Sequence, residues 1–119
     1  GGTGHQVRDV IHIDDVCDIT LLQIQRFKKI FNNTFNIGGG LKNKISLKDL
    51  TQKCQILAKR RIKIKKISTT SIFDIPYYVT DNRKIKKIYK WKPKRNINVL
   101  LSDIYEWLRS NKKLLNYFK

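Results

Sequence analysis

The chain has 119 residues, of which 40% are hydrophobic, and this fits one domain with a modest core. It contains no apolar run long enough to cross a membrane and no hydrophobic segment of a secretory signal near its first residues, so neither is predicted. Two cysteines, Cys17 and Cys54, are too few for a disulfide scaffold. We expect both to be reduced thiols in the core of a cytoplasmic protein.

The net charge of +17 comes from 26 lysines and arginines against 9 acidic residues. Such an excess is typical of proteins that bind nucleic acid or an anionic membrane surface. The chain is also rich in lysine, isoleucine and asparagine, whose codons are AT-rich, and its lysines are scattered. The sequence therefore leaves two interpretations open: compositional drift with solvated surfaces, or a genuine anion-binding field.

Residues 6–15, QVRDVIHIDD, are the first informative stretch. Residues 9–13 alternate and are rich in β-branched side chains, which predicts a short strand. Asp14 or Asp15 is then expected to cap a helix that reaches about position 29, with Ile19 on its inner face. The first residues, GGTG, are expected to form a loop that leads into this strand, and the sequence contains no methionine. Because a protein rarely begins in the middle of a binding loop, we expect this chain to be the C-terminal part of a longer protein.

Residues 34–37, TFNI, predict a short buried strand, and Gly38, Gly39 and Gly40 follow it. Three consecutive glycines cost backbone entropy. They indicate either a flexible loop or a place where the chain turns tightly or lets a ligand approach. They lack the spacing of a G-x-G-x-x-G motif and the helix that follows it, so a cofactor loop is not predicted.

Ser46 and Asp49 form a capping-box-like start for a helix over residues 47–59. Residues 61–67 alternate isoleucine with lysine, which predicts an exposed edge strand. Residues 72–80 are expected to be loop or extended chain, held open by a proline.

Asp81 is expected to cap a short helix over residues 82–89, which ends before the Trp-Lys-Pro stretch. Trp91 is expected to anchor a corner of the core rather than to stack on a nucleic-acid base. Asn96 or Asn98 should open the last helix. Its predicted inward-facing residues are Leu100, Leu101, Ile104, Trp107 and Leu108.

His5, His12, Asp14, Asp15 and Cys17 lie close together in the sequence, but no pair has the spacing of dedicated metal ligands. We therefore predict no metal site. His12 is expected to be packed and hydrogen-bonded, and the two aspartates suit a helix cap better than a catalytic pair. The sequence has no G-x-S-x-G elbow that would indicate a hydrolase.

Arg8 is the strongest candidate for ligand binding. It lies between a glycine-rich loop and a predicted strand, at a strand entrance. A guanidinium there can bind a phosphate through two parallel hydrogen bonds. The alternative is a structural ion pair with Asp9 or Asp15.

Four stretches together resemble the C-terminal third of the NAD-dependent nucleotide-sugar epimerases and dehydratases, in the extended short-chain dehydrogenase/reductase family. They are QVRDVIHIDD (6–15), FNIGGG (35–40), SLKDLT (46–51) and DIPYYVTDNRKIKKIYKWKPK (74–94). The GG-x-G-x-QVRD lead-in is most similar to the CDP-paratose 2-epimerase (CDP-tyvelose epimerase) branch. Each motif is weak alone, whereas their order and spacing are specific to the family.

The resemblance implies an α/β fold, made of the edge of a Rossmann domain plus a small α/β substrate domain. Residues 1–40 would complete the cofactor domain as strand, helix and strand, residues 41–95 would form part of the substrate-binding domain, and residues 96–119 the C-terminal helix and tail. NAD would be bound mainly by an N-terminal part that this chain lacks. The implied partners are a nucleotide-sugar and that missing part, with a homodimer conceivable for the intact protein; neither membrane nor nucleic acid is expected.

Arg8 matches the family arginine that contacts the nucleotide diphosphate of the substrate, and Gln6 matches a glutamine that faces the nucleotide, so the resemblance assigns both to substrate binding. Many relatives carry R-P-G-D where this chain reads SIFD at residues 71–74, and only Asp74 matches. The missing arginine would be a second phosphate contact.

The glycine-rich NAD loop and the catalytic Tyr-x-x-x-Lys pair of the family have no match here, so no catalytic residue is assigned. The resemblance thus implies a substrate-binding segment of an NAD-dependent epimerase that is inactive alone. The alternative is a small basic module without catalytic activity that binds nucleic acid or an anionic surface.

Overall fold

The computed structural model describes residues 3–29, 32–65, 69, 71 and 73–118. Its elements in chain order are β1 (Val7–Asp9), α1 (Ile13–Gln25), η1 (Phe27–Lys29), η2 (Leu41–Asn43), β2 (Lys44–Ser46), α2 (Leu47–Leu57), α3 (Arg83–Tyr89), α4 (Ile97–Ser110) and η3 (Lys112–Phe118). None of the helices in these ranges has the length and apolarity needed to cross a membrane.

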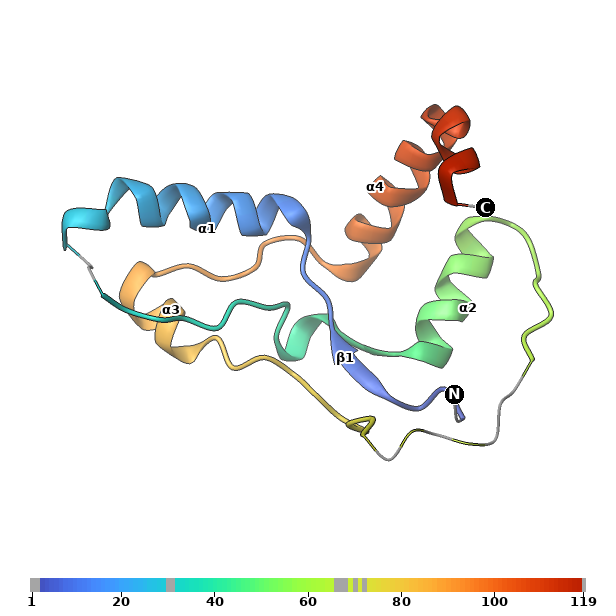
Figure 1. Ribbon diagram of the computed structural model, residues 1–119, viewed down its shortest axis with the longest axis horizontal. Helices are drawn as coiled ribbons and strands as arrows, with labels where there is room; N and C mark the ends of the chain where they lie inside the picture. Colours follow the sequence, from blue (N-terminus) through green and yellow to red (C-terminus); the bar gives the residue numbers. More distant parts are fainter. Residues whose placement is uncertain (1–2, 30–31, 66–68, 70, 72, 119) are drawn as a thin grey trace.

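The chain is open and elongated. α1 and α3 lie at one end, α2 and α4 lie at the other, and β1 runs between them (Figure 1). The principal extents are 52 × 38 × 24 Å and the radius of gyration is 17.3 Å. A single domain of this length would have a radius of gyration of about 13.5 Å. The helices and strands are therefore packed less closely than those of a compact domain of the same length.

The strand predicted over residues 9–13 is wrong in position, because the strand lies earlier, at β1. β1 pairs with β2 in antiparallel register, with Arg8 opposite Ile45. Val7 also bridges Tyr77 in parallel, which draws the extended segment 73–80 alongside β1. The strand cannot continue through residue 13 because α1 begins there.

His12 caps α1, so the prediction of an aspartate cap is wrong. Its Nδ1 accepts a hydrogen bond from the Asp14 N–H at 3.1 Å, which leaves the proton on Nε2 to donate to Asp103 Oδ2 of α4 at 3.0 Å. His12 is 7% exposed, which confirms it as a packed, hydrogen-bonded residue. Asp14 and Asp15 fall inside the first helical turn instead.

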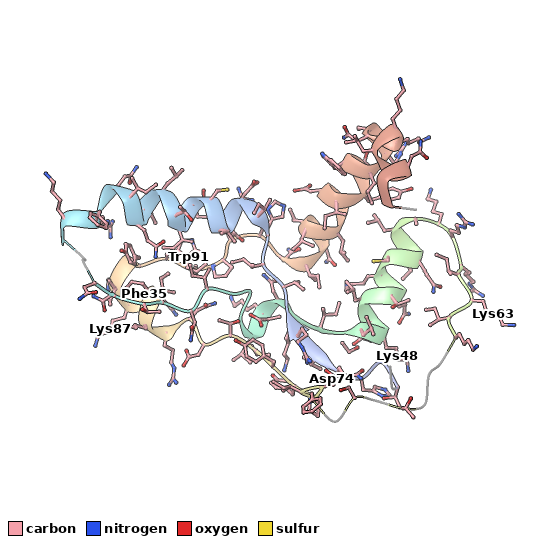
Figure 2. All side chains as sticks on the ribbon, viewed as in Figure 1. Phe35, Lys48, Lys63, Asp74, Lys87 and Trp91 are labelled. Carbon is pink, nitrogen blue, oxygen red and sulfur yellow. The ribbon has the colours of Figure 1, made fainter. Side chains whose placement is uncertain are left out.

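The hydrophobic core forms where α1 meets α3. Ile19 of α1 packs with Ile85 and Tyr89 of α3 and with Trp91, and Phe35 meets Tyr89 edge-on with ring centroids 5.4 Å apart. Figure 2 shows Phe35 and Trp91 in the region between the two helices. The predicted core position of Trp91 is confirmed, since it is 3% exposed.

Residues 34–37 are extended but form no strand in the described part of the chain. Phe35 and Ile37 pack against the core, whereas Thr34 and Asn36 are exposed, so the predicted alternation is present. A strand needs a neighbouring strand to exchange backbone hydrogen bonds with, and this segment has none among the described residues. Residues 60–65 are likewise without strand structure, and the rest of the edge strand predicted over 61–67 lies outside the described residues.

The predicted helix starts are confirmed in the second half of the chain. Ser46 accepts the Asp49 N–H at 3.0 Å at the start of α2, and Asn96 accepts from two backbone N–H groups at the start of α4. α3 begins one residue later than predicted, with Asn82 at the N-cap position and without a capping bond from its side chain, and the Asp81 carboxylate before it accepts the Arg83 N–H at 2.9 Å. Local cap chemistry is thus sufficient to place these three starts.

The predicted inner face of α4 is only partly confirmed: Leu100, Leu101 and Leu108 are half-buried, whereas Ile104 and Trp107 are each 50% exposed, and no residue of α4 is fully buried. Cys17 and Cys54 are also exposed, not core thiols as predicted. The reason is shared: among the described residues, α2 and α4 cover one another only in part, and no other element lies over the outer side of α1 (Figure 1).

Candidate functional site

β1 separates two sets of polar side chains. Successive residues of a strand point to opposite faces, so Arg8 and the preceding Gln6 share one face while Asp9 points to the other. The two sets have different partners, and each connects β1 to a distant part of the chain.

Gln6 and Arg8 converge on one carboxylate. Arg8 Nη2 donates to Asp74 Oδ1 at 2.8 Å and Gln6 Nε2 donates to Asp74 Oδ2 at 3.1 Å, while Arg8 Nη1 donates to the Val7 carbonyl at 2.8 Å. The alternative of a structural ion pair for Arg8 is therefore confirmed in kind, but its expected partners, Asp9 or Asp15, are wrong, because the partner is Asp74. Figure 2 shows Asp74 beside β1.

The backbone holds this arrangement in place. Val7 N–H donates to the Pro76 carbonyl at 2.9 Å, and Tyr78 N–H donates to the Val7 carbonyl at 3.0 Å. These bonds fix the segment that carries Asp74 against β1. The Arg8 side chain remains 41% exposed, so its guanidinium is both oriented and reachable from solvent. An oriented guanidinium beside a donor amide suits an acceptor with several oxygens, such as a carboxylate or a phosphate.

Asp9, on the other face, organises the turns behind β1. Its Oδ2 accepts the Gly40 N–H at 2.7 Å, and its Oδ1 accepts the N–H and the hydroxyl of Thr80 at 3.1 and 3.2 Å. Both oxygens are therefore used within the protein, and Asp9 has a structural role.

The glycine triplet is a close chain crossing, so its interpretation as a flexible loop is wrong. Gly38 exchanges two hydrogen bonds with the Asn82 side chain, at 2.8 and 3.2 Å, and is buried together with Gly39. A Cβ at Gly39 would lie 1.9 Å from the Val10 carbonyl oxygen. Gly40 has φ +68°, the left-handed region that favours glycine.

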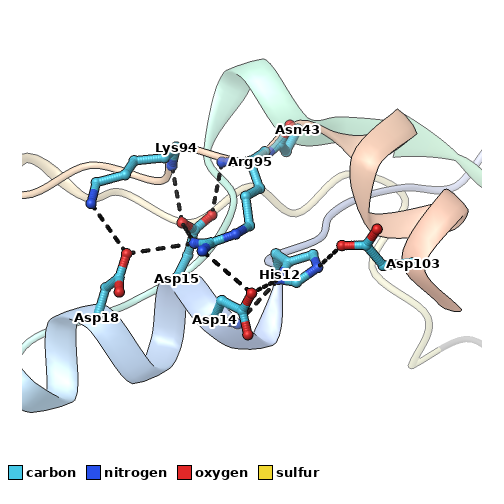
Figure 3. Close-up of polar contacts among 8 residues, drawn as sticks. All are labelled: His12, Asp14, Asp15, Asp18, Asn43, Lys94, Arg95 and Asp103. Atoms are coloured by element: carbon cyan, nitrogen blue, oxygen red, sulfur yellow. Dashed lines mark hydrogen bonds and ion pairs between the residues drawn. The ribbon is translucent and has the colours of Figure 1, made fainter. Parts of the chain in front are cut away.

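Asp15 is the centre of a polar network that joins α1 to the segment before α4 (Figure 3). It is fully buried, and its carboxylate accepts from the backbone N–H groups of Lys94 and Arg95 and from Arg95 Nη1 at 2.9 Å. The Lys94 ammonium lies 3.2 Å from Asp18, and this hydrogen bond lowers the pKa of Asp18 below its ordinary value. Asp15 thus has a structural role.

No cluster of three or more histidine, cysteine or acidic side chains suited to a metal ion occurs within the described ranges. His5 instead contacts Thr3 at 2.9 Å, and Cys17 is an exposed free thiol.

Comparison with known proteins relates the chain to one group of enzymes. No protein-family model matches the sequence. The CDP-paratose 2-epimerase of Salmonella typhi is 29% identical over 109 residues, which are 92% of this chain and 32% of that protein. The UDP-glucose 4-epimerase of Mycoplasma pneumoniae is 32% identical over 104 residues, 84% of this chain and 30% of that protein.

The fold agrees with this relation. The structure of UDP-glucose 4-epimerase from Thermotoga maritima matches with a TM-score of 0.80 and 24% identity, over 93% of this chain and 34% of that one. The chain is homologous to the nucleotide-sugar epimerases of the extended short-chain dehydrogenase/reductase family. This epimerase-family segment spans about one third of the length of its relatives.

The predicted fold class and family are confirmed by these matches. The division of the epimerase segment at residues 40 and 95 stays a prediction, as do the substrate-binding roles of Gln6 and Arg8. The structure does bring these two side chains together, on one face of β1. Sequence reasoning missed that Asp74 joins them, although the match of Asp74 to the R-P-G-D motif was the signal available.

Proposed function

We propose that this chain supplies the nucleotide-diphosphate-binding side of an NAD-dependent nucleotide-sugar epimerase similar to CDP-paratose 2-epimerase. The observation that carries the proposal is the convergence of the Arg8 guanidinium and the Gln6 amide on a single carboxylate, that of Asp74. In the substrate complex, phosphate oxygens would accept hydrogen bonds from the Arg8 guanidinium and the Gln6 amide, either in place of the Asp74 carboxylate or together with it. The nucleotide base, the sugar and the carbon that is epimerised are set elsewhere in the protein.

Relatives and neighbours support this class of substrate. The Salmonella typhi relative is a CDP-paratose 2-epimerase. The Thermotoga maritima structure was solved with UDP-glucose, and a further structural neighbour was solved with UDP-glucuronic acid and NAD. All are enzymes of nucleotide-linked sugars, and a diphosphate is the chemical group common to their substrates.

NAD is the implied cofactor, and it would oxidise the sugar transiently by accepting a hydride and returning it. The glycine triplet does not fit a dinucleotide cradle, because the side chains of Thr80 and Asp9 fill the space beside Gly38 and the Val10 backbone fills the space beside Gly39. We therefore place its contacts in the two thirds of the protein that this chain does not span. Without them the chain is expected to bind no NAD and to be inactive.

The exposed apolar side of α1 suits an interface with the missing NAD-binding part of the protein. Ile13, Leu21 and Ile24 are 67%, 57% and 67% exposed. An apolar stripe of this kind is costly in water and usually marks an interface. A cytoplasmic location and a homodimer of the intact enzyme belong to the same proposal.

The Arg8→Ala variant tests the assigned site. In the protein that contains the NAD-binding part, we expect affinity for UDP and CDP, measured by calorimetry, to fall by about 10- to 150-fold, because a hydrogen bond to a charged group contributes about 1.5–3 kcal/mol. Arg109→Ala, an exposed change on α4, is the matched control and should leave affinity unchanged. Equal affinities of the two variants would refute the role of Arg8.

The coding DNA upstream provides a separate check on the family assignment. A continuous reading frame with a glycine-rich NAD loop and a Tyr-x-x-x-Lys pair would support it. A start codon directly before Gly1 would contradict an active enzyme made from one chain.

A further inference from the structure

Asp74 places a negative charge on the two donors that the proposed function assigns to phosphate. Its Oδ1 accepts from Arg8 Nη2 at 2.8 Å, and its Oδ2 accepts from Gln6 Nε2 at 3.1 Å. The chain has only 9 acidic residues against 26 lysines and arginines. One of these few acids therefore lies against the candidate phosphate donors, and its charge lowers the attraction of Arg8 for any other anion.

The backbone on both sides of Asp74 fixes the position of its carboxylate. Before it, a turn is closed by the hydrogen bond from the Asp74 N–H to the Ser71 carbonyl at 3.0 Å. After it, Pro76 and Tyr78 are hydrogen-bonded to Val7 of β1, beside which Asp74 lies (Figure 2). An ion pair with one partner fixed by the backbone loses less side-chain entropy on forming than most exposed ion pairs do. The pair is therefore a built feature of this site.

The Arg8 guanidinium can contact a ligand while Asp74 stays in place. A guanidinium has five N–H donors, and the hydrogen bonds to Asp74 and to the Val7 carbonyl use two of them. The Arg8 side chain is 41% exposed. An anion that binds there gains hydrogen bonds, but it meets a guanidinium whose charge is already balanced by a carboxylate 2.8 Å away.

This balance affects small and large ligands differently. A simple inorganic anion has no contacts beyond the cluster, so the Asp74 charge opposes most of what would hold it. A nucleotide-sugar adds contacts through its base and its sugar, which the proposed function places elsewhere in the protein. An unfavourable charge built against the wrong ligand is a general means of specificity. A chain with a net charge of +17 attracts anions of every kind, so it has a use for such a device.

We propose that Asp74 is an internal counter-ion that keeps Arg8 and Gln6 from binding simple inorganic anions, so that stable binding requires the further contacts of a complete nucleotide-sugar. Asp74 is then a specificity-determining residue of the candidate site. The inference rests on the proposed function, because it takes Arg8 as a donor to phosphate.

Inorganic pyrophosphate is the probe, with binding measured by calorimetry on the protein that contains the NAD-binding part, saturated with NAD. Asp74→Asn keeps the shape of the side chain and removes its charge, and we expect it to bind pyrophosphate about fivefold more tightly than wild type. Glu106→Gln is the matched control, because it removes the same charge from an exposed site on α4. It should leave the affinity for pyrophosphate within about twofold of wild type.

A double variant, Arg8→Ala with Asp74→Asn, separates a local effect on Arg8 from general attraction by charge. If Asp74 acts on the guanidinium, the gain seen in Asp74→Asn disappears once Arg8 is removed, and a double-mutant cycle measures this coupling. A competition experiment on the unmodified protein does not depend on how well a variant folds. Millimolar inorganic phosphate should leave its affinity for UDP within about twofold, and should weaken UDP binding to Asp74→Asn by more than that.

Three results would overturn the inference while Arg8→Ala still weakens UDP binding, and the proposed function would then stand. Asp74→Asn could bind pyrophosphate no more tightly than Glu106→Gln does. Its gain could persist in the double variant, which would show general attraction by charge. Inorganic phosphate could compete strongly with UDP in the unmodified protein. If Arg8→Ala instead leaves the UDP affinity unchanged, the proposed function itself is refuted, and the counter-ion role of Asp74 is refuted with it.

Discussion

The Asp15→Ala variant is expected to lose about 3 kcal/mol of unfolding free energy, because two backbone N–H groups and the partly exposed Arg95 guanidinium lose the buried acceptor that they share. Asp15 is 0% exposed, and it satisfies the Arg95 guanidinium and two backbone N–H groups. Without the carboxylate, those donors lose a buried acceptor. Because this loss is a large part of the stability of a small domain, the cooperative urea transition followed by far-UV circular dichroism should shift strongly or disappear at 25 °C.

Asp14→Ala is the matched control, one residue earlier in the same helical turn. The Asp14 side chain is 55% exposed and lies 3.3 Å from Arg95, so its loss should cost less than about 1 kcal/mol. Asp15→Asn keeps the shape and one acceptor oxygen and should fall between the two. If Asp15→Ala and Asp14→Ala have the same urea midpoint, the Asp15 network does not carry the stability assigned to it.

The role of Asp15 shows where sequence reasoning stops. An aspartate before an apolar periodic stretch is a good helix cap by local rules, and nothing nearby in the sequence indicates that its partner is Arg95, 80 residues further on. The starts of α2, α3 and α4 were predictable because their caps lie within three residues of the N–H groups that they accept. Most locally encoded helix starts were found, the His12 cap of α1 being the exception, and long-range polar pairs were not.

The same distinction explains the misplaced apolar faces. Periodicity identifies which side of a helix is apolar, but it cannot say whether another layer is present to cover that side. For α4 the pattern predicted full burial, and for residues 34–37 it predicted strand pairing, and neither is present among the residues that the structure describes. Likewise, the sequence identified Gln6 and Arg8 but not the Asp74 carboxylate that orients them, because β1 and the segment beside it meet only in the folded chain.

Gly39→Ala is the second change with a large expected effect, a loss of about 3 kcal/mol in unfolding free energy, at the upper end of the cost of overpacking. The added Cβ would lie 1.9 Å from the Val10 carbonyl oxygen and 2.8 Å from Asn43 Cβ. Val10 cannot move away freely, because its N–H donates to the Asn43 carbonyl at 3.1 Å. The chain segments around Gly39 and Val10 would have to move apart, and the hydrogen bond from the Gly40 N–H to the Asp9 carboxylate would be lost.

The effect should also reach the candidate site, because Val10 follows β1 directly and β1 carries Arg8. In the protein that contains the NAD-binding part, Gly39→Ala should therefore weaken nucleotide-diphosphate binding as well as stability. Asn36→Ala, an exposed change in the same segment, should alter the melting temperature little. A Gly39→Ala variant that melts like wild type but loses NAD would contradict the close crossing, and it would instead support a glycine-rich loop that leaves room for the cofactor.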